Sequence, residues 1–249
     1  MRFAPVINAL ALPPDARVDQ RVPKKLLLEQ GAPTVTDKRH IQDGIEEIVW
    51  IAALKPTNIG VPAFQDETRE YLEVAVLSAN LRPQAKATRL IELIHRAIPY
   101  PLVLLTAHNG TVSLSLAHKR ASQAEGGRVV LDGPVLVATL APQSCALESA
   151  FLGSLRVADQ PARDLFTLYQ GWIDRVLALA AARLTGRFVP AADAAIARKD
   201  ALDEHVRIQR EIAGLRAQAG KEKQLNRRVD LDLAIQRLEA QLATVSEQL

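Results

Sequence analysis

Apolar residues in the first half of the chain recur at spacings typical of two helices. The first set lies on one helical face from residue 41 onward, and we predict that this helix ends at Lys55-Pro56, because a residue before proline disfavours the helical conformation. A second helix is predicted over residues 84–98. The two apolar stripes are Ile41, Ile45, Ile48, Val49 and Ala52 in the first helix, and Ala87, Leu90, Ile91, Ile94 and Ile98 in the second.

Strand patterns occur both before and after the second predicted helix. Residues 71–78 predict a strand with Leu72, Val74 and Val76 on one face, and residues 111–117 alternate between apolar and polar positions. Residues 102–107 form a continuous apolar run that predicts a fully buried strand. Asn109-Gly110 and Asp132-Gly133 are typical of tight hairpins, the second joining residues 128–131 to residues 135–140. This order of elements predicts an α+β fold with a small mixed, mostly antiparallel sheet and packed helices.

The second half of the chain is predicted to be helical and to end in a coiled-coil hairpin. One heptad seam runs from Leu231 to Leu249, and an earlier seam runs from Ile208 to Ala219. The two seams are out of register by about two residues, which favours an antiparallel hairpin over one unbroken rod. A dimeric coiled coil is the alternative. Whether the two helices pair within one chain or between two chains stays open.

Four segments follow from these patterns. Five prolines in residues 1–36 predict an extended arm with one short helix near Lys24–Gln30. Residues 37–150 form the predicted sheet domain, and residues 151–190 form a helical segment packed on its core. Residues 191–249 form the predicted hairpin.

The composition is that of an ordinary globular protein. Of the 249 residues, 48% are hydrophobic and 24% are charged, which is enough apolar material for a core. The single cysteine, Cys145, excludes an internal disulfide and a structural zinc site. No apolar run reaches the ~18 residues of a membrane span, and the N-terminus lacks a signal-peptide pattern. We therefore expect a cytoplasmic protein with no membrane association.

Charge is divided unevenly between two adjacent segments. Residues 40–81 carry two basic and seven acidic residues, for a net charge of −5, whereas residues 82–128 carry seven basic and two acidic residues, for a net charge of +5. The two segments can face each other in the fold. Alternatively, the second can form a basic surface for phosphates or an acidic partner. Its candidate binding residues are Arg82, which precedes the predicted helix over residues 84–98, and Lys86 and Arg89 within that helix.

The sequence contains no recognisable catalytic constellation. Glycine-rich phosphate loops, a nucleophile elbow and the histidine spacings of zinc sites are absent. Glu73 is the only acid within a predicted strand, which disfavours a metal-dependent nuclease. Arg89 and His95 form an R-x₅-H string but do not share a helical face, so we interpret them as two surface side chains. We expect no enzyme activity, no cofactor, no metal and no catalytic residues.

Two strings remain as candidate binding sites for nucleic acid or a partner. His118, Lys119 and Arg120 are either a strand end meeting solvent or a phosphate contact. The second string lies between the two heptad seams and is either a solvated bend or a basic, amide-rich binding tip. Its candidate residues are Lys221, Lys223, Gln224, Asn226, Arg227 and Arg228.

Five strings in the same order make the chain similar to a bacterial family catalogued as domain of unknown function 4391. They are Val22-Pro23-Lys24-Lys25, the run from Val49 to Ile59, the run from Ala97 to Leu102, the run from Leu116 to Arg120, and the run from Glu222 to Leu231. The family tends to show phenylalanine at the position of Leu225, and a Leu-Asn pair where this chain has Leu231-Asp232. Roles that depend on that aromatic ring or amide do not carry over.

The resemblance implies context rather than chemistry. Such proteins are neighbours of helicase-like ATPases and adenine-type DNA methyltransferases in restriction or anti-phage defence operons. The leading hypothesis is therefore a non-catalytic accessory subunit that docks on such a partner, with a possible homodimer through the C-terminal coiled coil. The alternatives are a DNA-binding module that uses residues 82–128 and 221–228, and an unrecognised nuclease.

Overall fold

The computed structural model describes residues 2–124, 127–141, 145–190 and 195–249. The chain divides into two compact units, Met1–Val176 and Leu177–Leu249. The first contains the sheet and most helices, and the second contains a long helical hairpin. The two units are described separately below.

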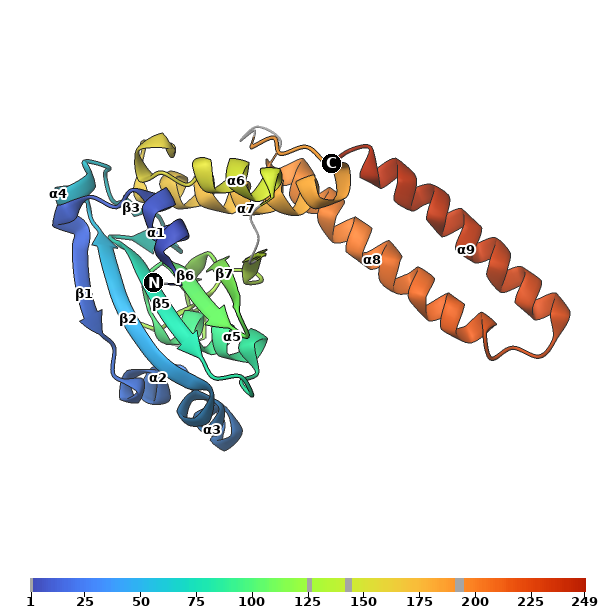
Figure 1. The fold of residues 1–249 in the computed structure, drawn as a ribbon, viewed down its shortest axis with the longest axis horizontal. Helices are drawn as coiled ribbons and strands as arrows, with labels where there is room; N and C mark the ends of the chain where they lie inside the picture. The colour runs from blue at the N-terminus through green and yellow to red at the C-terminus, as the bar shows by residue number, and fades with distance from the viewer. Residues whose placement is uncertain (1, 125–126, 142–144, 191–194) are drawn as a thin grey trace. The chain divides into compact units, whose positions relative to one another are not determined.

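A six-stranded mixed sheet organises the first unit (Figure 1). Neighbouring strands are antiparallel except for β5 and β6, which are parallel and joined by helix α5 (Ala87–Ala97). The strand order across the sheet is β1 (Arg17–Arg21), β2 (Ile45–Leu54), β5 (Val74–Leu81), β6 (Leu102–His108), β7 (Thr111–Leu116) and β10 (Leu136–Leu140). This arrangement confirms the predicted α+β class.

Helices cover both faces of the sheet (Figure 1). Helices α2 (Lys24–Gln30), α3 (Val35–Gly44) and α5 pack on one face, around a core that includes Leu77, Leu90, Ile94 and Leu104. On the other face lie α1 (Ala4–Leu10), α6 (Ala146–Gly153) and the first part of α7 (Leu165–Thr185). Short elements complete the unit: two 3₁₀ turns (Pro14–Ala16 and Val157–Asp159) and α4 (Pro56–Ile59).

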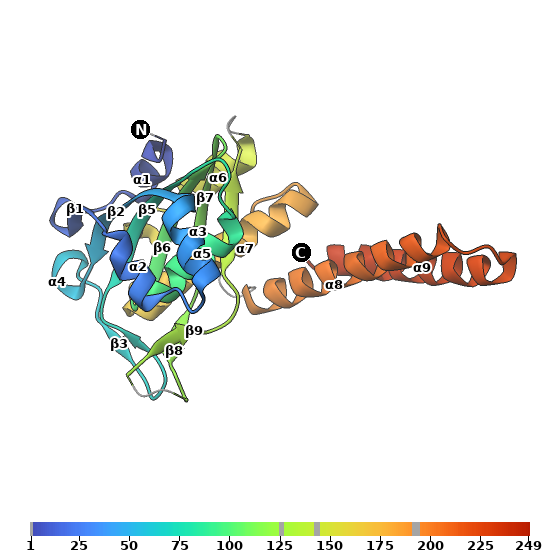
Figure 2. The same cartoon turned by 90° about the horizontal axis from the view of Figure 1, so that it is seen from below.

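Two small hairpins lie together at one end of the unit (Figure 2). One consists of β3 (Phe64–Gln65) and β4 (Glu70–Tyr71), and the other of β8 (Lys119–Ala121) and β9 (Val129–Leu131). The backbone N–H of Ala121 donates to the carbonyl of Thr68 at 2.6 Å and joins the two hairpins.

The predicted helix over residues 41–55 is wrong for most of its length. The helix α3 ends at Gly44, and residues 45–54 form β2, an interior strand of the sheet. The pairing of β2 with β5 shifts register between Ile45 and Glu47 and again between Trp50 and Ala52. Each irregularity interrupts the two-residue alternation. The buried residues Ile45, Ile48 and Ile51 are consequently three apart, which imitates a helical spacing.

The second predicted hairpin and the extended N-terminal arm also need correction. Strand β9 pairs with β8, whereas β10 pairs with β7, so Asp132-Gly133 connects two different sheets. The N-terminal segment contains α1 and contributes β1 to the sheet edge instead of remaining extended. The predicted short helix at Lys24–Gln30 is confirmed with the same bounds. The Asn109-Gly110 hairpin is confirmed between β6 and β7.

The second unit contains the end of α7 and an antiparallel hairpin of α8 (Ala195–Ala219) and α9 (Leu225–Ser246) (Figure 1). The two helices pack through the predicted seams, which confirms the hairpin over the unbroken rod. The buried centre consists of Ile208, Ile212 and Ile235, flanked by the partly buried Leu215, Leu238, Leu242 and Val245. Among the described residues, no helix is long and apolar enough to span a bilayer.

Candidate functional site

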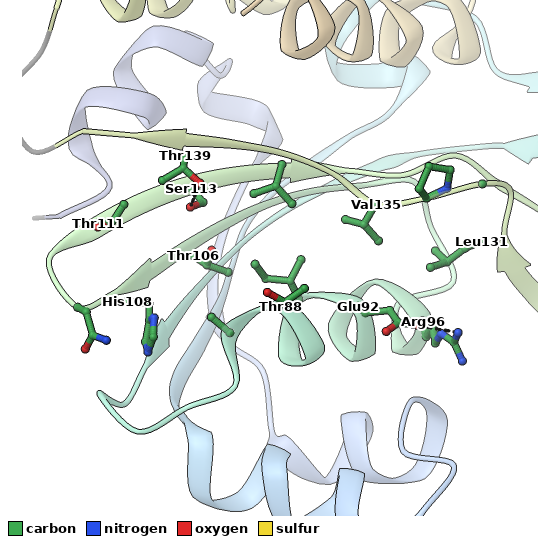
Figure 3. Close-up of a pocket in the computed structure, with 16 residues that line it drawn as sticks. Thr88, Glu92, Arg96, Thr106, His108, Thr111, Ser113, Leu131, Val135 and Thr139 are labelled. Atoms are coloured by element: carbon green, nitrogen blue, oxygen red, sulfur yellow. Dashed lines mark hydrogen bonds and ion pairs between the residues drawn. The ribbon is translucent and has the colours of Figure 1, made fainter. Parts of the chain in front are cut away.

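A groove of about 820 Å³ lies between α5 and the last three strands of the sheet (Figure 3). Its sheet side consists of β6, β7 and β10, and its helix side consists of Ala87, Thr88, Ile91, Glu92 and Arg96. A concave site of this size with converging polar groups is the usual form of a ligand or peptide site.

The sheet side of the groove is lined by hydroxyl groups. The face of β6 that lies under α5 carries the buried Leu102 and Leu104. The next residue on that face is Thr106. Register places Thr106 beside Ser113 and Ser113 beside Thr139, so one row of hydroxyls crosses three strands. The Ser113 hydroxyl donates to Oγ1 of Thr139 at 3.2 Å. The alternation of β7 places its polar residues on one face, but the row across three strands also depends on the pairing of β7 with β10.

Charges on the helix side of the groove neutralise one another. The Glu92 carboxylate accepts Arg89 Nη1 at 2.7 Å and contacts Arg96 Nη2 at 2.6 Å. Thr88 and Ile91 complete the helix side between these charges and the sheet. The groove therefore presents hydroxyl and aliphatic groups rather than a basic field for phosphates.

The basic residues predicted near α5 serve mainly the fold. Arg89 reaches the buried Asp37 on α3 with two hydrogen bonds of 2.8 and 2.9 Å. The hydrogen bond from Arg89 holds the pKa of Asp37 down to about 2, although burial acts in the opposite direction. Arg82 donates to the carbonyl of Asp43 near the end of α3. Lys86 precedes α5 and is exposed.

Replacing Arg89 with methionine tests this structural role. We expect a loss of about 2–3 kcal/mol in the free energy of unfolding, because Asp37 would keep a buried charge without its main partner. Urea denaturation measures this change. The matched control is Lys86→Met at the residue that precedes α5, for which we expect a change within ~0.5 kcal/mol. Equal stabilities of the two variants would contradict the role of Arg89.

The His118–Arg120 string does not form a surface phosphate contact. Nδ1 of His118 lies 2.6 Å from the Tyr71 hydroxyl and Nε2 lies 2.7 Å from Oε1 of Gln170 on α7. Burial lowers the pKa of His118 and keeps the ring neutral at physiological pH. Both ring nitrogens are therefore committed to contacts that join the small hairpins to α7. His118 does lie between the ends of β7 and β8, as predicted, but its ring nitrogens contact protein groups instead of solvent.

Lys119 is 3% exposed, so the alternative in which it contacts phosphate is also wrong. Its ammonium donates to the backbone carbonyls of His95 and Ile98 at the C-terminal end of α5. Cations at this end of a helix satisfy carbonyls that lack an intrahelical partner. Burial lowers the pKa of Lys119 to about 7.

Arg120 and His95 are likewise held by neighbouring groups. Arg120 lies 3.6 Å from Asp132, which also accepts two hydrogen bonds from Arg69 at 2.7 and 3.0 Å. His95 is fully buried, 3.0 Å from the Ser115 hydroxyl, and burial lowers its pKa to about 3. The interpretation of His95 as a surface side chain is therefore wrong.

The bend between α8 and α9 places the remaining candidate residues on the surface of the second unit. All six of these residues are exposed: Lys221, Lys223, Gln224, Asn226, Arg227 and Arg228. Sequence reasoning missed a second feature of this region, an apolar stripe on α9. Leu225, Val229 and Leu233 are 74%, 48% and 47% exposed. Their spacing of four residues places them on one helical face, and this was the signal available in the sequence.

The described residues contain no cluster of three or more histidine, cysteine or acidic side chains suited to a metal ion. Glu73, the acid considered for a nuclease, lies 3.2 Å from Lys55 in an ion pair. Cys145 is exposed as a free thiol.

These features define an α+β protein with a hydroxyl-lined groove in one unit and an exposed apolar helix face in the other. The sequence profile of the family described as Domain of unknown function (DUF4391) matches residues 10–242, and the chain belongs to that family. Neither the curated proteins nor the solved structures contain a significant match.

Proposed function

We propose that the protein is a non-catalytic interaction subunit that docks through the outer face of α9 on a protein partner. The observation that carries this proposal is the apolar stripe of Leu225, Val229 and Leu233, which has no covering element in the hairpin. Three large aliphatic side chains exposed along one helix face are typical of a groove-binding or bundle-forming helix.

The chemistry around the stripe supports a protein partner. Burying the stripe removes apolar surface from water, which is the main driving force of protein association. Charged residues, among them Arg227, Arg228, Asp230 and Asp232, lie between the stripe positions and would form a polar rim. A nucleic-acid backbone offers no comparable apolar surface.

The identity of the partner is the second part of the proposal. Membership of the family, together with the operon context that the resemblance implies, favours a helicase-like ATPase or an adenine DNA methyltransferase of a bacterial restriction or anti-phage system. A cytoplasmic location is consistent with such a partner. The protein would then position or regulate an enzyme that supplies the chemistry.

Direct DNA binding at the hairpin bend is the second candidate function. The bend has a local net charge of +2. It carries two acidic residues, Glu222 and Asp230, and four exposed basic residues, Lys221, Lys223, Arg227 and Arg228. A surface of this size supports a few phosphate contacts, and its affinity would fall steeply with salt.

A triple variant, Leu225→Glu, Val229→Glu and Leu233→Glu, tests the docking face. We expect recovery of the partner that co-purifies with the wild-type chain to fall by about tenfold or more, because burial of three charges opposes association. Helical content measured by circular dichroism should be unchanged, since the seam between α8 and α9 is intact.

The matched control is the double variant Lys221→Glu and Lys223→Glu in the bend that precedes α9, outside the proposed rim. We expect this variant to keep the partner and to lose any affinity for DNA. Retention of the partner by the triple variant, with loss in the lysine variant, would overturn the proposal in favour of DNA binding.

A further inference from the structure

Thr106 places a hydroxyl without a protein partner on the sheet side of the groove beside α5 (Figure 3). The residue is 3% exposed, and within the described part of the chain its Oγ1 forms no hydrogen bond. A hydroxyl this deeply buried keeps few contacts with bulk water and costs stability unless it is hydrogen-bonded. A valine here would continue the apolar face of Leu102 and Leu104. The hydroxyl is therefore better explained by a group that it binds in the groove than by the needs of the fold.

The neighbouring hydroxyl, that of Ser113, is limited to accepting a hydrogen bond from a molecule in the groove. Thr106 and Ser113 are register partners on β6 and β7, so their Cβ atoms are about 4.5–5.5 Å apart. The Ser113 proton is donated to Oγ1 of Thr139, which leaves only lone pairs on Ser113, whereas Thr106 still has its proton to donate. A ligand hydroxyl between the two side chains can accept from Thr106 and donate to Ser113. A carbonyl only accepts and an ammonium only donates, so neither group can do both.

His108 adds a second acceptor further along β6, and it also lines the groove. Its Nε2 lies 3.1 Å from the carbonyl oxygen of Pro83, which can only accept, so Nε2 carries the ring proton. When the ring is neutral, Nδ1 is an acceptor. His108 follows Thr106 by two residues on the same face of the strand, a separation of about 6.6 Å. The two positions match two hydroxyls that one rigid framework holds apart.

The remaining lining of the groove fits an uncharged ring. Among its described residues, Arg96 carries the only permanent positive charge, and Nη2 of Arg96 lies 2.6 Å from the Glu92 carboxylate. A phosphate or carboxylate ligand therefore has no free cation to bind. Ile91 of α5 and Val137 of β10 provide aliphatic surface on which the C–H groups of a ring can pack. The volume of about 820 Å³ is typical of a site for a small molecule.

We propose that this groove binds an uncharged, hydroxyl-bearing ring of the carbohydrate type. The ring would place one hydroxyl between Thr106 and Ser113, direct a second towards His108, and pack its C–H groups against Ile91. A free sugar and the ribose of a nucleoside both carry these groups, so two kinds of ligand share this chemistry. The site goes beyond the proposed docking function, because it lies in the first unit and uses no residue of the α9 face.

Saturation-transfer NMR of the full chain with neutral sugars and ribonucleosides tests this site. The panel contains glucose, galactose, mannose, ribose, maltose and the common ribonucleosides, each at millimolar concentration. We expect at least one compound to bind and to shift amide resonances of β6 and β7. Binding of a nucleoside without binding of ribose would show that the base packs on the aliphatic surface. Binding of a sugar alone would identify the ligand class as free carbohydrate.

The variants Thr106→Val and Ser115→Ala separate ligand binding from stability. In Thr106→Val, we expect the affinity for the best compound to fall by about tenfold or more, while the urea midpoint stays at or above that of the wild type. Ser115 is fully buried on the same face of β7, and its hydroxyl lies 3.0 Å from Nε2 of His95 and donates to the carbonyl of Leu104 at 3.4 Å. The matched control Ser115→Ala should therefore lower the urea midpoint and keep the affinity.

Three results would overturn this inference. They are the absence of binding across the whole panel, equal affinity of the best compound for wild type and Thr106→Val, and amide shifts centred outside β6 and β7. The first result would assign the Thr106 hydroxyl to an ordered water only. The α9 triple variant should bind the best compound as the wild type does, so failure of this site and failure of the α9 docking face are measured separately.

Discussion

Lowering the pH from 10 to 7 will destabilise the wild-type protein by about 4 kcal/mol more than its Lys119→Met variant. Burial lowers the pKa of Lys119 in the native state to about 7, whereas an exposed lysine in the unfolded chain has a pKa of 10.5. Between these two values the unfolded chain binds more protons than the native protein, so stability rises with pH. Each pH unit in that range corresponds to about 1.4 kcal/mol.

The pH dependence of stability that Lys119 causes has defined limits. Below pH 7 both states are protonated and the full cost of burying the charge is present, and above pH 10.5 both are neutral and the cost is gone. A neutral amine still donates to the carbonyls of His95 and Ile98, so the contact with α5 persists. Denaturant unfolding at several pH values measures the difference between the two proteins. Parallel pH profiles would contradict the burial of this amine.

Removing one hydroxyl, with Tyr169→Phe, will lower the free energy of unfolding by about 3 kcal/mol. The Tyr169 hydroxyl accepts the N–H of Ala117 at 2.9 Å and lies 2.8 Å from the carbonyl of Leu102 and 3.1 Å from that of Ala117. The site is fully buried, so phenylalanine would leave these backbone groups without partners or water. This hydroxyl connects α7 to the start of β6 and the end of β7.

Tyr100→Phe is the matched control for this effect. Tyr100 is 37% exposed and contacts Trp50 edge-on through its ring, which phenylalanine retains. The Tyr100→Phe substitution should change the free energy of unfolding by less than ~0.5 kcal/mol in the same thermal or chemical denaturation series. Similar losses of unfolding free energy in the two variants would contradict the expected stabilisation by the hydrogen bonds of the Tyr169 hydroxyl.

The sequence predicted a helix or strand correctly where the spacing of its apolar residues was regular along the whole element. Helix α5 and strands β6 and β7 fall in this group, because their apolar residues keep a single spacing and the Asn109-Gly110 turn is unambiguous. Strand β2 does not, because two register shifts within ten residues produce buried positions three apart. Its β-branched isoleucines and valine favoured a strand and were the overlooked signal.

Site prediction from sequence was limited by the lack of distances between segments. Lys119 lies in a basic string, and only the fold shows that its amine reaches the end of α5 more than twenty residues earlier. The hydroxyl row likewise requires the pairing of β7 with β10, which the predicted Asp132-Gly133 hairpin replaced with a different partner. The exposed bend of the α8–α9 hairpin was accessible from sequence because it depends on local contacts alone.

The most direct test of the proposed function is purification of the tagged full chain from its native host, with and without nuclease, followed by mass spectrometry. We expect a helicase-like ATPase or DNA methyltransferase in stoichiometric amount that survives nuclease and is lost in the α9 triple variant. Recovery of the chain alone, or of partners that disappear after nuclease treatment, would contradict it and favour direct nucleic-acid binding.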